Sequence, residues 1–159
     1  HTEADFRKWA QGFAEPKEPS EAMAKAGKEL FGELGCGGCH AIKGHPRAKG
    51  IIGPNLTNYG ERIRISASGH YRSDDKLKTW IAAPDASKPG ATMVNNISRG
   101  PQGANDGMNV VSTNPAFDTD GDGLPNFTDE QLDKLVAYLN ALQIDGIDVP
   151  MPEHHAQNR

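Results

Sequence analysis

Two stretches of the chain have apolar side chains at three- and four-residue spacing, which predicts amphipathic helices that each bury one face. The apolar positions of the first are Met23, Ala26, Gly27, Leu30, Phe31 and Leu34. The second begins near Thr128, is ended by Gly146 and Pro150, and buries Leu132, Leu135, Val136, Leu139 and Leu142, with Tyr138 alongside. A glycine inside a helix costs about 1 kcal/mol relative to alanine, so we expect another helix to cross closely at Gly27.

Polar side chains mark the starts of the predicted helices. Ser20 is the expected N-cap of the first helix, with Glu21 favourable in its first turn. Thr128 and Gln131 have the spacing of a capping box. Ser73 is expected to cap a short helix that includes Leu77, Trp80 and Ile81 and stops at Pro84.

The other segments show little helical or strand periodicity. Phe6, Trp9 and Phe13 have helical spacing, but the segment that follows is rich in proline, so we interpret the N-terminus as an arm. Residues 94–117 are polar and long for a loop, which indicates an insertion. The predicted organisation is an arm or linker (1–19), one domain (20–146) that contains the insertion (94–117) and an acidic loop (118–129), and a frayed tail (147–159).

The composition adds an argument for a cofactor. The chain has 159 residues, about one domain, yet only 36% of them are hydrophobic and 6% aromatic. That is lean for a core of this size, so a bound apolar cofactor would supply the missing apolar mass. No apolar run has the length of a membrane span and no signal peptide is visible at His1, so we expect a mature product or an excised soluble domain.

The net charge of -4 conceals an uneven distribution. From Cys36 to Arg72 basic residues dominate, and from Asp106 to Asp148 acidic residues dominate. A patch of one sign can orient a docking protein, although each charge taken singly is equally consistent with a solvated surface. We expect protein partners, no nucleic acid, and a monomeric domain.

Residues Cys36-Gly37-Gly38-Cys39-His40 have the C-x-x-C-H spacing. Two thiols at this spacing can add to the vinyl groups of a haem, and the adjacent histidine can then bind the iron. The two glycines would leave room for the porphyrin edge. The motif predicts one covalent haem c and, because this attachment takes place outside the cytoplasmic membrane, a periplasmic or extracytoplasmic location.

Two other uses of the cysteines stay open. Cys36 and Cys39 could be a thiol-disulfide redox pair, or half of a zinc site completed by His40 and His45. A redox pair would be expected in a βαβ context, and zinc would need a further ligand pair at finger-like spacing; the sequence shows neither. A thiol-redox or zinc-binding module is therefore the alternative from a different functional class.

The order of helix, C-x-x-C-H, Gly-Pro loop, short helix, methionine loop and last helix resembles class I cytochrome c over residues 26–142. The resemblance implies an all-α fold around one covalent haem, here with a long irregular insertion before the C-terminal helix. It also implies histidine and methionine as axial ligands. The positions where the family's first and last helices cross correspond to Gly27, Phe31 and Tyr138.

Further segments carry a closer resemblance: residues 5–9, 52–57, 62, 65–69 and 80–93. They look like the cytochrome c domain fused to subunit II of bacterial haem-copper oxidases. This resemblance implies an excised C-terminal haem domain, with the membrane anchor and dinuclear copper site upstream. Electrons would come from a quinol-oxidising complex or a soluble carrier and pass to copper; the alternative is a free-standing periplasmic carrier.

The resemblance also implies the iron ligands. His40 is the expected proximal ligand, with its second ring nitrogen held by the carbonyl of Pro54. Met93 follows a Lys-Pro-Gly sequence as the family's methionine does, although Val94 stands where the family usually has proline. The alternatives are Met108, carried by the insertion, and His70, whereas Met23 is expected in the core and Met151 in the tail.

Three more side chains match positions that in this family often lie near the haem propionates. These are Tyr59, Arg62 and Trp80, whose donors would offset buried negative charge. Trp80 is equally consistent with simple core packing. With six ligands on the iron no position is open, so the expected function is one-electron transfer without bond chemistry on a substrate.

Residues 118–129 have the period of a calcium loop, with glycine at the sixth position and an acid at the twelfth. Aspartate in place of glutamate at the twelfth position could weaken binding. The alternative is an acidic loop that favours the N-terminus of the following helix. A bound Ca²⁺ would fasten the insertion to the last helix through Asp118, Asp120, Asp122, Leu124, Asn126 and Asp129.

Overall fold

The computed structural model describes residues 2–14, 18–66, 69–89, 91, 93 and 127–144. In this part of the chain the regular structure is helical, and β-pairing is limited to two isolated bridges, Ala41 to Lys49 and Arg64 to Tyr71. The all-α prediction is confirmed. The helices are α1 (Glu3–Ala14), α2 (Ala22–Glu33), α3 (Asp74–Ala82), α4 (Pro84–Ser87) and α6 (Asp129–Ala141), with single 3-10 turns η1 (Cys36–Gly38) and η2 (Tyr59–Glu61).

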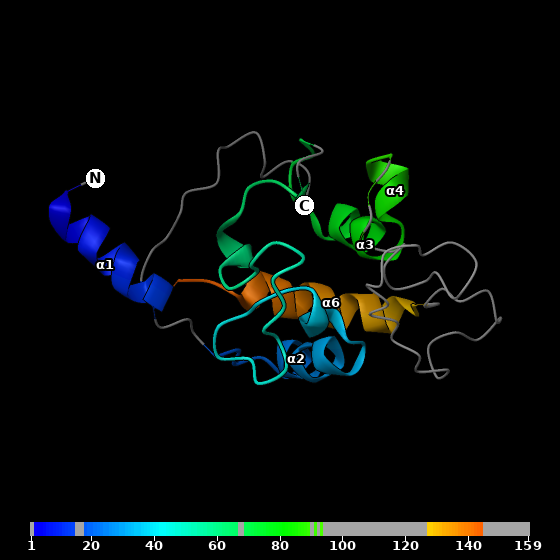
Figure 1. Cartoon of the computed structure of the whole chain (residues 1–159), viewed down its shortest axis with the longest axis horizontal. Helices are drawn as coiled ribbons and strands as arrows, with labels where there is room; N and C mark the ends of the chain where they lie inside the picture. The colour runs from blue at the N-terminus through cyan, green and yellow to red at the C-terminus, as the bar shows by residue number, and fades with distance from the viewer. Residues whose placement is uncertain are drawn as a thin grey trace.

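The centre of the core is the crossing of α2 and α6 (Figure 1). A Cβ atom at Gly27 would lie 1.9 Å from the carbonyl oxygen of Lys134 and 2.7 Å from Cβ of Tyr138. Tyr138 is only 1% exposed, and its ring meets the edge of Phe31 at a centroid distance of 5.7 Å. The predicted close crossing at Gly27 is confirmed, and the predicted apolar stripe of α6 is buried in it.

The start of α2 departs from the sequence prediction. The N-cap is Glu21, without a side-chain hydrogen bond, so the expected cap at Ser20 is wrong. Met23 is 51% exposed, while the adjacent Ala24 is buried, so the core position predicted for Met23 is also wrong. The reason lies one turn later: the backbone contact at Gly27 brings the two helices so close that a small side chain is the one that fits.

The other two predicted caps are present. The hydroxyl of Ser73 accepts a hydrogen bond from the Lys76 amide at 3.3 Å at the start of α3. Thr128 and Gln131 form the predicted reciprocal capping box, at 3.2 and 2.9 Å. Pro84 ends α3 as predicted and also opens the one-turn helix α4, where a proline at the first position loses no helical hydrogen bond.

Helix α6 ends at Ala141, earlier than the Gly146 and Pro150 boundary predicted from the sequence. The chain leaves the helix there because it attaches to η2. The amide of Gly60 donates to the carbonyl of Leu142 at 2.8 Å, and the amide of Ile144 donates to the Glu61 carboxylate at 2.9 Å. Tertiary contacts with a distant loop thus set the end of this helix.

The N-terminal arm contains a helix, which the sequence analysis did not predict. Helix α1 extends away from the other helices (Figure 1). Phe6 and Trp9 lie on one side of it with ring centroids 5.8 Å apart, and they are 61% and 39% exposed. Their helical spacing was therefore a genuine helix signal.

In the part of the chain that the structure describes, no helix has the length and apolar character needed to cross a membrane. The insertion (94–117) and the tail (147–159) lie outside the described residues, and so do Met108 and Met151. Of the acidic loop, only residues 127–129 are described.

Candidate functional site

The turn that follows α2 carries the two cysteines. Gly35, with φ +76°, allows the chain to leave the helix in a left-handed conformation. The amides of Cys39 and His40 then both donate to the carbonyl of Cys36, at 3.2 and 3.0 Å. Both thiols are free and half-buried, and Cys36 packs against the core. The helix and its C-terminal turn thus hold the thiols and the imidazole on one short segment.

The backbone of the loop that follows, residues 41–50, holds this turn in place through hydrogen bonds. The amides of Lys49 and Gly50 both donate to the carbonyl of Gly37, at 3.2 and 3.0 Å. A Cβ atom at Gly37 would lie 2.0 Å from the Arg47 carbonyl oxygen. A glycine is therefore required at position 37 because the Arg47 backbone lies against it. The sequence analysis had explained this glycine by the room that a porphyrin needs.

The imidazole of His40 is held in one tautomer. Its Nδ1 lies 2.9 Å from the carbonyl oxygen of Pro54, which confirms the predicted contact. Because a carbonyl can only accept, Nδ1 donates and Nε2 keeps its lone pair for a metal. Burial lowers the pKa of His40, which favours the neutral form that a metal requires.

Gly53 packs directly on this imidazole, and the sequence analysis did not single it out. A Cβ atom at Gly53 would lie 2.5 Å from Cε1 and 2.6 Å from Nδ1 of His40. The amide of Gly53 also donates to the carbonyl of Cys39 at 2.8 Å. The sequence signal that could have identified Gly53 is its position immediately before Pro54, whose carbonyl orients His40.

The geometry does not favour the two alternative uses of the cysteines. Burial raises the pKa of the Cys36 thiol to about 12 and also raises that of Cys39, whereas a reactive redox thiol has a lowered pKa. Both ring nitrogens of His45 are engaged with backbone groups, so His45 does not face a metal. In the described residues no group of three or more His, Cys, Asp or Glu side chains could hold a metal ion.

A buried polar cluster lies in and next to η2. Tyr59 is 5% exposed and Asn58 is 8% exposed. Among the described side chains, the hydroxyl of Tyr59 and both amide atoms of Asn58 are the buried polar atoms without a partner. The guanidinium carbon Cζ of Arg62 lies 5.6 Å from the Tyr59 ring centroid, and the guanidinium of Arg72 donates to the Tyr59 carbonyl at 3.3 Å. The sequence analysis singled out Tyr59 and Arg62 but missed Asn58 and Arg72.

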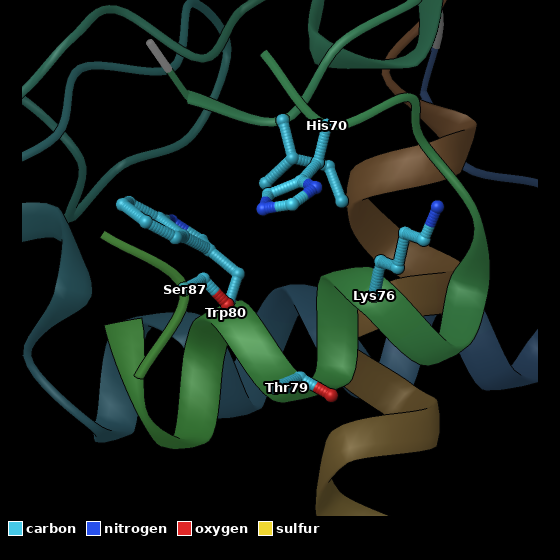
Figure 2. Close-up of a pocket in the computed structure, with 6 residues that line it drawn as sticks. His70, Lys76, Thr79, Trp80 and Ser87 are labelled. Carbon is cyan, nitrogen blue, oxygen red and sulfur yellow. The ribbon is translucent and has the colours of Figure 1, made fainter. Parts of the chain in front are cut away.

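Trp80 lines a cavity of about 120 Å³ between α3 and the loop before it. Figure 2 shows the Trp80 indole and the His70 imidazole extending into this cavity from opposite sides. Trp80 also packs against the core, so both interpretations of this residue stay open. Met93 is half-buried. Its place relative to His40 stays a prediction.

The groups present fit a haem c. Two free thiols three residues apart can form thioethers, and His40 offers an oriented nitrogen. The Tyr59 hydroxyl and the Asn58 amide are buried without a partner, and Arg62 and Arg72 contact the ring and the backbone carbonyl of Tyr59. Such donors suit a carboxylate such as a propionate. For the predicted calcium site the structure describes Asp129 alone among the six ligands, so that site stays a prediction.

Comparison with known proteins agrees with this fit. The family model for cytochrome c matches residues 24–143. The curated relatives include proteins named cytochrome c oxidase subunit 2. The one from Alkalihalophilus pseudofirmus is 30% identical over 141 residues, which are 88% of this chain and 32% of that protein. The one from Bacillus subtilis is 35% identical over 92 residues, 56% of this chain and 26% of that protein. The chain thus spans about a third of the length of these relatives or less.

Proposed function

Since the chain belongs to the cytochrome c family, we propose that it transfers single electrons through one haem c bound to Cys36 and Cys39. The observation that carries the proposal is the arrangement at His40, where the Pro54 carbonyl fixes Nδ1 and leaves Nε2 available, one residue after a free thiol. When bound, haem c supplies an iron that changes its oxidation state by one electron.

The residues around the histidine have separate roles in this proposal. The Pro54 carbonyl fixes the ring of His40 and makes Nε2 a stronger electron-pair donor to a metal. Gly53 allows the backbone to lie against the ring. Tyr59 and Arg62, and Trp80 by resemblance, offer donors to the carboxylates of the cofactor. Met93 is the proposed second axial ligand.

We further propose that this chain is the haem domain of a larger oxidase subunit. Its relatives are named cytochrome c oxidase subunit 2, and the matched part of this chain covers only 32% and 26% of their lengths. The domain would accept electrons from a quinol-oxidising complex or a soluble carrier and pass them to the oxidase copper centre, on the outer side of the membrane. Its own residues would do no bond chemistry on a substrate. A free-standing periplasmic carrier is the alternative, favoured if the gene encodes a signal peptide directly before His1.

The first test is the visible spectrum of the purified protein in its oxidised and reduced states. The proposal expects haem bands that stay with the chain after denaturation, and their release in the double variant Cys36→Ala, Cys39→Ala. A colourless parent protein with two titratable thiols would refute haem attachment and favour the thiol or zinc alternative.

A second test separates the candidate methionine ligands. Loss of the weak far-red methionine-to-iron band in Met93→Ala alone would support Met93. Loss of that band in Met108→Ala alone would mean that the insertion supplies the ligand. His70→Ala tests the remaining candidate, histidine ligation, for which the parent protein would lack the methionine band.

We also propose that Ca²⁺ binds residues 118–129, since aspartates at alternate positions repel one another without a cation. Removal of calcium with a chelator should lower the thermal midpoint of the wild-type protein, and Asp120→Asn should abolish that response. An equal midpoint with and without the chelator would leave an acidic loop that only favours the start of α6.

A further inference from the structure

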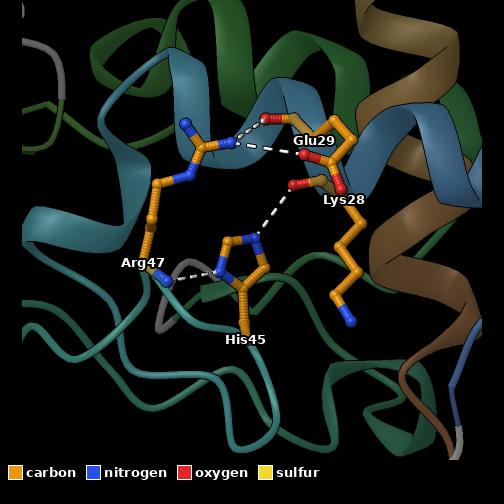
Figure 3. A network of polar contacts seen from close by, with 4 residues as sticks. All are labelled: Lys28, Glu29, His45 and Arg47. Atoms are coloured by element: carbon orange, nitrogen blue, oxygen red, sulfur yellow. Dashed lines mark hydrogen bonds and ion pairs between the residues drawn. The ribbon is translucent and has the colours of Figure 1, made fainter.

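His45 makes two hydrogen bonds that connect separate parts of the chain (Figure 3). Its side chain is buried, with 5% exposure. Nε2 lies 2.9 Å from the carbonyl oxygen of Lys28 in α2, and Nδ1 lies 3.1 Å from the amide nitrogen of Arg47. A histidine at the tip of a surface loop is thus inserted between that loop and a helix.

The partners determine the tautomer of this imidazole. The backbone amide of Arg47 can only donate, so Nδ1 accepts. The carbonyl of Lys28 can only accept, so Nε2 carries the proton and donates. Neutral His45 satisfies both partners. The bond to Lys28 is the one that leaves the loop and reaches α2.

The loop that carries His45, residues 41–50, leads back to the cysteine turn. It is closed by the bond from the Ile42 amide to the Ala48 carbonyl, at 3.0 Å. Its last two amides hold the carbonyl of Gly37, and its Arg47 carbonyl fills the space where a side chain at Gly37 would be. The tip of the 41–50 loop is therefore fixed to α2 through His45, and its C-terminal end supports the segment between the two cysteines.

Two further contacts show that His45 is the central attachment of this loop. Its ring lies 5.7 Å from the Phe31 ring and 6.0 Å from the Tyr138 ring, at the crossing of α2 and α6. Arg47 makes a second link to α2, from its guanidinium to the carbonyl and carboxylate of Glu29, both at 3.4 Å. The side chains of Arg47 and Glu29 are largely exposed, so this link contributes little to stability.

We propose that His45 is a positioning residue for haem attachment: through its bond to α2 it fixes the 41–50 loop, and through that loop the relative placement of Cys36, Cys39 and His40. This inference rests on the proposed haem function. It assigns a role to a histidine that the sequence suggested only as a zinc ligand.

Two variants separate the two bonds. In His45→Gln the side-chain amide can still reach and donate to the Lys28 carbonyl. In His45→Asn the shorter side chain can accept from the Arg47 amide but does not reach α2. Both variants lose the ring contacts with Phe31 and Tyr138, but only His45→Asn also loses the bond to α2, so a larger defect in His45→Asn than in His45→Gln reports that bond. Glu29→Gln, which alters only the exposed link, is the control.

Three quantities are measured on each variant of the 159-residue chain: the fraction of haem held by both thioethers, the midpoint reduction potential and the thermal midpoint. We expect His45→Gln and Glu29→Gln to match wild type in the fraction of doubly attached haem and in the midpoint potential. We expect His45→Asn to lose doubly attached haem, or to accumulate no holoprotein, and to shift the potential of what remains. A fall in thermal midpoint alone in His45→Asn, or equal changes in both His45 variants, would overturn the inference.

A measurement on the unaltered protein covers the case in which neither His45 variant folds. Nitrogen NMR of the wild-type holoprotein should show His45 protonated at Nε2, with a slowly exchanging proton. Protonation at Nδ1, or rapid exchange, would refute the bond to α2. A wild-type protein without haem would instead refute the proposed function, so the two failures are distinguishable.

Discussion

The crossing of α2 and α6 and the segment from Cys36 to Arg62 both depend on glycines, but they use them differently. At the crossing, Gly27 brings two helices together, and the surrounding side chains fill the space completely enough that Tyr138 is 1% exposed. In the segment, the glycines bring irregular backbone against backbone and against His40. The segment also keeps buried polar atoms without partners, at Asn58 and Tyr59.

The difference indicates which region depends on a cofactor. The helix crossing satisfies its packing with the chain's own atoms. The segment leaves two half-buried free thiols and an available imidazole nitrogen. It also buries the Tyr59 hydroxyl without a partner, which is costly. Changes at the crossing should therefore act on folding, and changes in the segment should act on the haem.

The largest effect is expected for Gly27→Ala. The new Cβ would overlap the backbone of α6, so the helices must separate, and we expect the free energy of unfolding to fall by about 3 kcal/mol or more. Denaturant unfolding measures it. The control is Gly32→Ala on the same helix, where the Cβ meets only the flexible end of the Arg47 side chain. A loss in Gly27→Ala no larger than in this control would contradict the close crossing.

The next effect is expected for Gly53→Ala, which places a methyl group against the imidazole of His40. The free energy of unfolding should fall by about 1 to 3 kcal/mol. The visible spectrum and the midpoint potential should also change, because His40, the proposed iron ligand, is displaced. Ile52→Ala, at a half-exposed neighbouring position, should leave both unchanged. An unaltered spectrum in Gly53→Ala would mean that Gly53 does not control the ligand.

An effect at high pH is expected for Tyr59. Burial raises its pKa to about 12, above that of an unfolded tyrosine near 10, so the folded state binds more protons between these values. Stability is fully present below about pH 10 and falls by about 1 to 3 kcal/mol as the pH rises towards 12. Tyr59→Phe should lose less over this range than wild type, in unfolding curves at fixed pH.

The same variant tests the polar cluster at neutral pH. If the Tyr59 hydroxyl donates to a haem propionate, Tyr59→Phe shifts the midpoint potential at pH 7. Tyr71→Phe, at an exposed tyrosine, is the control and should not shift it. An unshifted potential in Tyr59→Phe would leave the hydroxyl without a role at the haem.

The smallest effect is expected for Arg7→Ala in α1. Arg7 pairs with Glu3, and both side chains are more than 70% exposed. Such pairs contribute roughly 0.5 kcal/mol or less, so unfolding and the visible spectrum should stay as in wild type. A spectral change would show that α1 acts on the haem region, which would contradict the separation of the arm from the domain.

The sequence was sufficient for features that depend on local spacing. The cysteine motif, the caps at Ser73 and Thr128, the stripe of α6 and the close approach at Gly27 each follow from residue types a few positions apart. The His40 contact with Pro54 came from a family resemblance, and the structure confirms that contact. The roles of Gly53, Asn58 and His45 were missed, because each depends on a partner that the local sequence does not specify.

The sequence by itself determined the chemistry of this protein: two thiols and a histidine on one turn, and two amphipathic helices able to frame them. Tertiary structure decided the rest. It buried Ala24 and left Met23 half-exposed, because beside the backbone contact at Gly27 a small side chain fits. It ended α6 at Ala141 through bonds to η2, and it turned His45 from a candidate ligand into a link between loop and helix. Hydrogen bonds and close contacts between residues distant in sequence have no local signature, which is why only the folded chain reveals them.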